Sequence, residues 1–239
     1  MRKLIGCLAG IAVVSGCTTA VTPGTGTATT FKIRLASASA ADTLKPSDGS
    51  KAPAPISPAA WAVHASGQPI FTDGYADRGK GLEAQAEDGN PANLAASLKS
   101  DTTLSSTGVV TIPVGDTAAG PATPGKAFEF TVTAKPGDRL SFTSMFGQSN
   151  DVFVAPSADG IALFGADGKP TQGDVTSSVY LWDAGTEANQ EPGIGADQAP
   201  RQAAPNTGAA DPNKTVRKVN DGFKYPAMSE IIKVTITPQ

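Results

Sequence analysis

The chain has 239 residues, with 22 acidic and 19 basic side chains, one histidine and a formal net charge of −3. Lysine and arginine are not clustered, which excludes the basic surface that nucleic-acid-binding proteins use, so no nucleic-acid partner is expected. From Phe31 to Gln239 there is neither a linker-like change of composition nor a repeat. Residues 31–239 are therefore expected to form one domain.

The N-terminus has the pattern of an export signal. Residues 1–3 carry two positive charges, and residues 4–14 form an apolar run that is too short to span a bilayer. Residues 14–17, Val-Ser-Gly-Cys, resemble the lipobox of bacterial lipoproteins, in which the cysteine is lipidated and becomes the mature N-terminus. We therefore expect residues 1–16 to be a lipoprotein signal peptide and Cys17 to carry the lipid. An ordinary secretory signal cleaved nearby is the alternative.

A flexible tether follows the expected lipidation site. Residues 18–30 consist of Thr, Gly, Ala, Val and Pro, so residues 17–30 are predicted to connect the lipid to the folded domain. Thr18 is not the aspartate that favours inner-membrane retention, so an outer-membrane lipoprotein, periplasmic or surface-facing, is expected. Its lipid would be the only membrane contact. Cleavage before Cys17 also removes Cys7, which leaves a mature protein that relies on core packing, helped by a metal, rather than on disulfides.

Period-two alternation of apolar and polar residues dominates the rest of the chain and predicts many short strands. The expected strands are 31–35, 61–64, 128–132, 140–142, 151–154, 161–164, 179–182, 215–219 and 231–236. An Asp-Gly pair in 166–169 predicts a hairpin turn, and short helices are expected at 81–87 and 93–99. The fold class predicted from these elements is all-β, an antiparallel β-sandwich with one or two short helices and long loops.

Two long irregular segments, 36–58 and 183–213, remain between the expected strands. Loops of this length in a compact domain are usually functional or disordered. The second contains the acidic residues Glu187, Glu191 and Asp197, and we expect it to be functional, whereas the first has the composition of a plain loop.

Two strand ends carry acidic residues that are candidates for a metal site. Asp151 begins one expected strand, and Asp183 and Glu187 follow another, with no lysine or arginine inside either segment. If the segments lie side by side, three carboxylates converge and repel one another unless a cation lies between them, and hard oxygen ligands suit calcium. The spacing alone favours a simpler interpretation, two acidic turns at strand ends.

No catalytic motif is present, and the chain is expected not to be an enzyme. A G-x-S-x-G elbow, an H-E-x-x-H pair and a P-loop are all missing from the sequence. His64, between two apolar residues on an expected strand, is predicted to be a hydrogen-bonded structural histidine. Residues 87–90, Glu-Asp-Gly-Asn, lack the downstream ligands of an EF-hand and are interpreted as a turn between the two helices. Asp183 and Glu187 are better explained as co-ligands of a metal than as the acid and nucleophile of a glycan hydrolase, which stays as an alternative.

A series of segments resembles the spondin N-terminal domain, found in F-spondin, mindin and many bacterial secreted proteins. The resemblance covers roughly 31–239, and its most specific piece is the Asp-Ala-Gly-Thr motif that begins at Asp183. The segments that carry it are SPAAWAVH (57–64), GLEAQAEDG (81–89), PGDRLSF (136–142), SND (149–151) and DAGTE (183–187). It implies a β-sandwich similar to C2 domains.

The resemblance also implies a calcium site. Animal members bind one calcium ion through an aspartate that follows Ser-Pro and two acidic residues of the Asp-Ala-Gly-Thr motif, which correspond to Asp151, Asp183 and Glu187. Asn150 stands where those proteins have proline, and Glu187 replaces an aspartate, which can alter affinity or ion preference. The disulfides and thrombospondin repeats of the animal proteins are missing, so their integrin and matrix partners do not carry over.

The expected function is that of a calcium-binding, surface-displayed adhesion or ligand-binding module of the bacterial envelope, with an unknown protein or glycan as partner. The main alternative is an envelope scaffold in which calcium is purely structural. Calcium-dependent lipid docking, as in C2 domains, is disfavoured because the chain is already anchored and has no basic patch.

Overall fold

The computed structural model describes residues 26–239. The expected signal peptide 1–16, Cys17 and most of the tether 17–30 lie outside the described residues. The first strand begins at Thr29, two residues before the expected start of the domain at Phe31. Within 26–239, no helix has both the length and the apolar character needed to cross a membrane.

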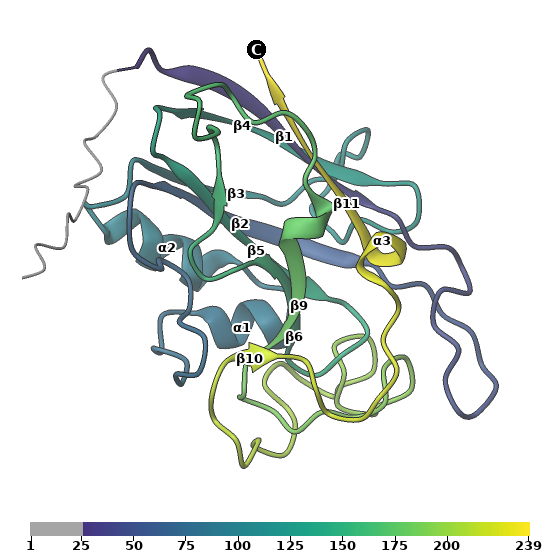
Figure 1. Ribbon diagram of the computed structural model, residues 1–239. Coiled ribbons are helices and arrows are strands. Elements are labelled where there is room, and N and C mark those ends of the chain that lie inside the picture. Colours follow the sequence, from purple (N-terminus) through teal and green to yellow (C-terminus); the bar gives the residue numbers. More distant parts are fainter. Residues whose placement is uncertain (1–25) are drawn as a thin grey trace, which may run out of the picture.

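The fold is an antiparallel β-sandwich, as predicted (Figure 1). The smaller sheet has the strand order β4 (Ala127–Ala134), β1 (Thr29–Ser37), β11 (Ile232–Pro238), β8 (Gly173–Asp174). The larger sheet has the order β10 (Arg217–Lys218), β9 (Val179–Asp183), β6 (Val152–Pro156), β5 (Arg139–Phe146), β2 (Ile56–His64), β3 (Ser106–Val110), and β7 (Ile161–Ala162) pairs with β5. Three helices complete the fold: α1 (Leu82–Glu87), α2 (Ala92–Ser100) and α3 (Met228–Ile231).

The core between the sheets follows from the period-two alternation. In β1, Phe31, Ile33 and Leu35 are buried while the residues between them are partly exposed. Ile236 and Val234 of β11 pair in register with Ile33 and Leu35. The buried side chains of both strands pack against apolar side chains of the larger sheet. Each fully buried side chain of this kind contributes about 1.5–3 kcal/mol to folding.

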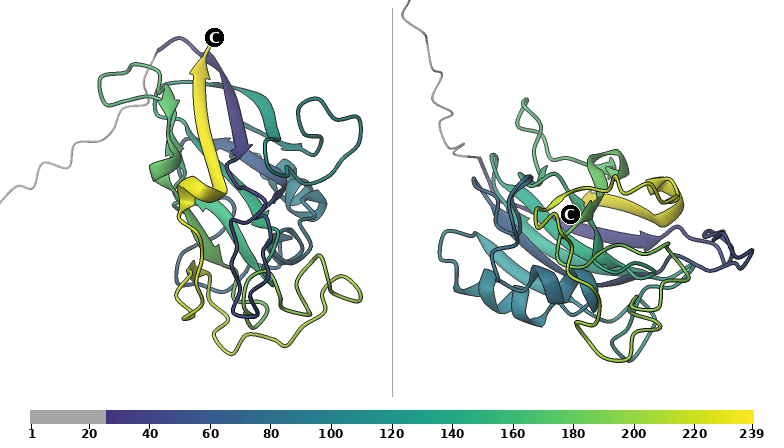
Figure 2. Two further views of the ribbon diagram at one scale, coloured as in Figure 1. Left: turned by 90° about the vertical axis from the view of Figure 1, so that its right-hand side faces the viewer. Right: turned by 90° about the horizontal axis from the view of Figure 1, so that it is seen from below.

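The larger sheet is buried on both faces, because α1 and α2 cover the face that points away from the smaller sheet. Small residues of β2, Ala60 and Ala62, allow the helices to approach, and Leu82 and Leu94 pack with Trp182 in this second apolar cluster. Figure 2 shows the two helices on one side of the larger sheet and β1 and β11 on the other. This layering places the end of α1 beside the end of the larger sheet.

Most of the expected elements are present, and most departures are at sheet edges. The exception is α3, a third helix where one or two were expected, whose last residue, Ile231, is the first of the expected strand 231–236. The expected strands 161–164 and 215–219 shorten to the two-residue strands β7 and β10, and β3 and β8 were not anticipated. The 166–169 turn closes a hairpin, with a bridge between Phe164 and Pro170. His64 is fully buried, and its two ring nitrogens lie 3.0 Å from the Ser66 carbonyl and 2.9 Å from Ser141 Oγ, in keeping with the predicted structural role.

The approach of α2 to the start of α1 requires a glycine at position 81. Gly81 has φ +96°, and a Cβ there would lie 2.4 Å from the backbone nitrogen of Leu94. Gly79 also has a positive φ, but a Cβ there would meet nothing within 4 Å.

Gly79→Ala is therefore expected to lower the free energy of unfolding by about 1 kcal/mol, from backbone strain alone. Gly81→Ala is expected to lower it by about 3 kcal/mol, because the clash adds to the strain. Urea unfolding of both variants measures the difference, and equal losses would contradict a close α1–α2 contact.

Candidate metal centre

The acidic residues expected to converge lie together at one end of the larger sheet. Asp151 immediately precedes β6, Asp183 is the last residue of β9 and pairs in register with Val152, and Glu187 follows in the loop. A hydrogen bond from the Ala184 amide to the Asp151 carbonyl continues this pairing beyond the strands. The two segments therefore lie side by side, as the metal interpretation requires.

Asp151 is 0% exposed and holds the turn that carries Glu187. Its Oδ2 accepts hydrogen bonds from the backbone amides of Thr186 (2.8 Å) and Glu187 (3.1 Å), and from the Thr186 hydroxyl (3.2 Å). Gly185, with φ +70°, lets the chain turn back toward Asp151. The other oxygen, Asp151 Oδ1, is buried without a hydrogen-bond partner.

Glu187 is 3% exposed and also has one oxygen free. Its Oε2 accepts a long hydrogen bond of 3.4 Å from Asn150 Nδ2, and Oε1 is buried without a partner. The Oδ1 of Asn150 in turn accepts a hydrogen bond from the Gln190 amide. Asn150 thus positions both Glu187 and the loop that follows it. Gly208 lies against the Glu187 carboxyl, so closely that a Cβ there would be 2.6 Å from Glu187 Cδ.

A third buried carboxylate, Glu87, was not among the expected ligands. The 87–90 segment does form the turn between α1 and α2, but the Glu87 side chain is 1% exposed and neither of its oxygens has a hydrogen-bond partner. Helical spacing from Leu82 through Ala86 places Glu87 at the edge of the buried stripe of α1. That periodicity was the signal in the sequence that Glu87 points inward.

Glu87, Asp151 and Glu187, together called the acidic centre below, act on one another electrostatically. Burial is the largest cause that raises the pKa of Glu87 to about 8; the Thr186 hydroxyl opposes the shift, and the negative charges of Glu187, Glu83 and Asp151 add to it. Burial also raises the pKa of Glu187 to about 7, with Asp151 contributing, and it raises the pKa of Asp151. The three carboxylates are therefore close enough to disfavour one another's charge.

Asp183 differs in having an arginine partner, which opposes but does not cancel the rise of its pKa to about 7 that burial and the nearby charge of Asp151 cause. Asp183 is 0% exposed; its Oδ1 accepts a hydrogen bond from the Gly185 amide (2.8 Å), and its Oδ2 accepts from Asn189 Nδ2 (2.8 Å). Arg217 Nη2 lies 2.7 Å from the same oxygen and 2.6 Å from Asp211 Oδ2. The arginine comes from β10, which pairs with β9 so that Arg217 is opposite Asp183. Asp183 thus has a cationic partner from outside the two expected segments, whereas Glu87, Asp151 and Glu187 are in no salt bridge within residues 26–239.

The free oxygens of the acidic centre are of the kind that calcium prefers as ligands. Four carboxylate oxygens there are buried without partners: both of Glu87, Asp151 Oδ1 and Glu187 Oε1. Buried charges without partners are costly, and a hard divalent cation would supply both the charge and the ligation that these oxygens lack. Within 26–239, no three His, Cys, Asp or Glu side chains already surround a common point as a metal site would. Binding therefore requires the free oxygens to turn toward a shared ion, which their mutual repulsion opposes while no ion is bound.

The raised pKa values predict how the metal-free protein responds to pH. The folded state favours the protonated form of Glu87, because burial raises its pKa from the ordinary value of 4.5 to about 8. This contribution to stability is complete below about pH 4.5 and is lost as pH rises toward 8. Urea unfolding in a chelator is therefore expected to show stability falling between about pH 5 and pH 8. Calcium should reverse the trend, because it displaces these protons. A metal-free stability that rises across this interval would contradict the assignment.

Comparison with known proteins gives no assignment: no protein-family model matches the chain, and no curated protein sequence matches it. The spondin resemblance therefore stays an expectation based on its motifs, and the case for function rests on the residues of the acidic centre and their surroundings.

Proposed function

We propose that the protein is a calcium-binding adhesion or ligand-binding module of the spondin N-terminal type, displayed on a bacterial envelope and without enzymatic activity. One observation carries this proposal: Glu87, Asp151 and Glu187 place four unpartnered carboxylate oxygens in the interior of the protein. A glycan hydrolase is a weaker alternative, because both oxygens of Asp183 already accept hydrogen bonds and one is paired with Arg217.

Calcium at the acidic centre would connect three separate parts of the chain. Glu87 ends α1, Asp151 immediately precedes β6, and Glu187 lies in the long segment between β9 and β10. That segment runs past the end of the larger sheet without regular secondary structure of its own (Figure 1). In this proposal the ion fixes the start of the segment, and Asp183 with Arg217 fixes its end. At a hundredfold excess over the dissociation constant, calcium would stabilise the fold by about 2.7 kcal/mol.

The location of the module follows from its N-terminus. A lipid on Cys17 and the tether that follows would hold the sandwich at the envelope surface, and this is supported by the lipobox-like sequence of residues 14–17. The long segment between β9 and β10, ordered by calcium, would present the surface that recognises a protein or a glycan.

A purely structural role for calcium is a second candidate, and the burial of the acidic centre favours it. Side chains that are 0–3% exposed cannot themselves contact a partner, so the ion would act only through the loop that it orders. Such a scaffold would need calcium for stability and would have no separate ligand.

Adhesion measured on a metal-site variant distinguishes the two candidates. Cells that display the lipidated Glu187→Gln protein are compared with wild type on surfaces coated with glycans or matrix proteins, at a temperature where the variant stays folded. The adhesion module predicts loss of attachment together with a lower melting temperature, because the amide is a poorer calcium ligand. A scaffold predicts only the lower melting temperature, and wild-type cells that do not attach to any such surface would count against adhesion.

A further inference from the structure

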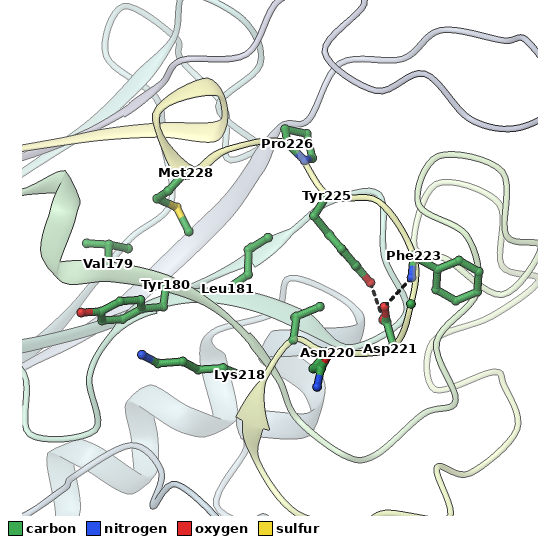
Figure 3. A pocket seen from close by; sticks show the side chains of 12 residues that line it. Val179, Tyr180, Leu181, Lys218, Asn220, Asp221, Phe223, Tyr225, Pro226 and Met228 are labelled. Carbon is green, nitrogen blue, oxygen red and sulfur yellow. Dashed lines mark hydrogen bonds between the residues drawn. The ribbon is translucent and has the colours of Figure 1, made fainter.

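A second candidate site lies outside the acidic centre, where β9 meets the chain that follows β10. An open cavity of about 490 Å³, called the tyrosine pocket below, is lined by residues of β9 and of the segment from Lys218 to Met228 (Figure 3). Tyr180 and Lys218 form one wall, Tyr225 and Asp221 form the other, and Leu181 and Met228 lie between them. The pocket therefore combines aromatic and aliphatic surface with polar groups at its rim.

The second wall is held in place by hydrogen bonds. The Tyr225 hydroxyl donates to Asp221 Oδ2 (2.8 Å), the Phe223 amide donates to Asp221 Oδ1 (3.0 Å), and the Val219 amide donates to the Leu181 carbonyl (3.2 Å). Tyr225 also packs against Phe146 of the core, with ring centroids 6.0 Å apart. This wall is built before any ligand arrives, which reduces the ordering cost of binding.

The polar groups at the rim have hydrogen-bonding capacity to spare. Lys218 Nζ lies 3.7 Å from the centroid of the Tyr180 ring and, within the described part of the chain, is in no salt bridge. Asn220 is exposed at the rim and brings both a donor and an acceptor. Each oxygen of Asp221 already accepts one hydrogen bond and can accept another.

The charge balance of the pocket selects among ligand classes. One cation, Lys218, and one anion, Asp221, line it, so a phosphate would meet the carboxylate and a quaternary ammonium would meet the amine. An acyl chain would leave the donors and acceptors of the rim unused. A neutral sugar ring matches both the aromatic surface of the pocket and the polar groups at its rim. One face of the sugar presents C–H groups to an aromatic ring, and its hydroxyls donate and accept hydrogen bonds.

We propose that the tyrosine pocket binds a neutral pyranose unit of a glycan, with the face of the Tyr180 ring that Lys218 does not cover against the C–H face of the sugar, and with Asn220, Asp221 and Lys218 hydrogen-bonded to its hydroxyls. This names the ligand class for the adhesive function and rests on that proposed function. The pocket is distinct from the acidic centre, none of whose residues line it. β10 lies between the two: Arg217 pairs with Asp183, which is close enough to Asp151 for that charge to raise its pKa, and the next residue, Lys218, lines the pocket.

The test uses residues 18–239, which contain every described helix and strand, in calcium. Saturation-transfer NMR with glucose, galactose, mannose, N-acetylglucosamine and their β- and α-linked disaccharides identifies binding, and calorimetry measures affinity. We expect saturation of C–H protons on one face of the ring. Tyr180→Ala should weaken binding about tenfold and Asn220→Ala about threefold, as expected for loss of one aromatic and one hydrogen-bonding contact.

Control variants distinguish a loss of saccharide affinity at the pocket from a loss caused by a general change in the protein. Tyr180→Phe keeps the ring and should restore most of the affinity that Tyr180→Ala loses. Tyr75→Ala removes a tyrosine that is 68% exposed and does not line the pocket, and it should leave affinity unchanged. Because Asn220 is exposed, its variant stays informative if Tyr180→Ala proves unstable.

Three results would overturn the proposal: no saturation transfer from wild type to any of these saccharides at millimolar concentration, binding that neither pocket variant weakens, or tighter binding of glucuronate or choline than of the neutral sugars. A calcium melt on the same samples keeps the two proposals apart. A calcium shift without saccharide binding removes only the saccharide proposal, and saccharide binding without a calcium shift removes only the metal site.

Discussion

Replacing Arg217 with methionine is expected to lower the free energy of unfolding by about 3–5 kcal/mol, because it leaves a buried carboxylate without its cation. Asp183 is 0% exposed, and the Arg217 guanidinium lies 2.7 Å from its Oδ2 while also pairing with Asp211. Methionine keeps the aliphatic stem but not the charge, so the loss reports on the ion pair. The two-residue strand β10 depends on the same contact, so proteolysis near its ends should also become faster.

Arg34→Met is the matched control for this experiment. Arg34 lies 2.6 Å from Glu129, an equally short contact, but both side chains are substantially exposed. An exposed pair of this kind contributes about 0–1 kcal/mol. Chemical denaturation of the two variants, at one pH and with calcium present, measures the contrast. Equal losses would mean that burial of Asp183 does not govern the energetics of the pair.

Glu87→Gln is expected to change stability in opposite directions with and without calcium. In the metal-free protein at about pH 8, the amide removes a buried negative charge that faces Asp151 and Glu187, so the melting temperature should rise. In calcium the same change removes a charged ligand, and the dissociation constant for calcium should increase on the order of 100-fold. Thermal melts over a calcium titration record both effects in one experiment.

Glu83→Gln is the control, since Glu83 belongs to the same helix but is not fully buried and accepts a hydrogen bond from Asn206. It should leave calcium affinity nearly unchanged. A structural role for Glu87 without metal would show as destabilisation in both conditions. An unchanged calcium response in Glu87→Gln would remove this residue from the site.

The strands that form the core were predictable because their pattern has a single physical cause. Phe31, Ile33 and Leu35 alternate with charged residues since one face of β1 is buried and the other is open to solvent. Short edge strands such as β8 and β10 leave no such pattern. They form because the neighbouring strands, β11 for β8 and β9 for β10, have backbone N–H and C=O groups available for pairing. That pairing depends on the assembled sheet and not on the local sequence.

The candidate site was predictable only where its residues belong to strand ends. Asp151 and Glu187 could be placed together because adjacent strands bring their ends to one edge. Glu87 reaches the same place through the packing of α1 on the larger sheet, and Arg217 reaches Asp183 through a pairing 34 residues along the chain. Neither contact follows from the spacing of acidic residues at strand ends, so that spacing pointed neither to Glu87 nor to the pairing of Asp183 with Arg217.

The sequence resemblance and the structure emphasise different members of the acidic set. The resemblance assigns calcium to Asp151, Asp183 and Glu187, whereas unpartnered oxygens occur on Glu87, Asp151 and Glu187. Asp183 keeps a defined part in the proposed centre, since its ion pair positions β10 and its Oδ1 bonds the turn at Gly185. Alanine at Asp183 should therefore reduce stability in calcium and in chelator alike, unlike Glu87→Gln.

A thermal melt of residues 18–239 in calcium, in magnesium and in a chelator tests the central claim most directly. We expect a large rise in melting temperature that is specific to calcium, because the buried carboxylates would bind the ion only in the folded state. The rise should be lost in Glu87→Gln and Glu187→Gln. No shift with any ion would contradict the metal centre and leave the three buried carboxylates as protonated groups of a metal-free fold.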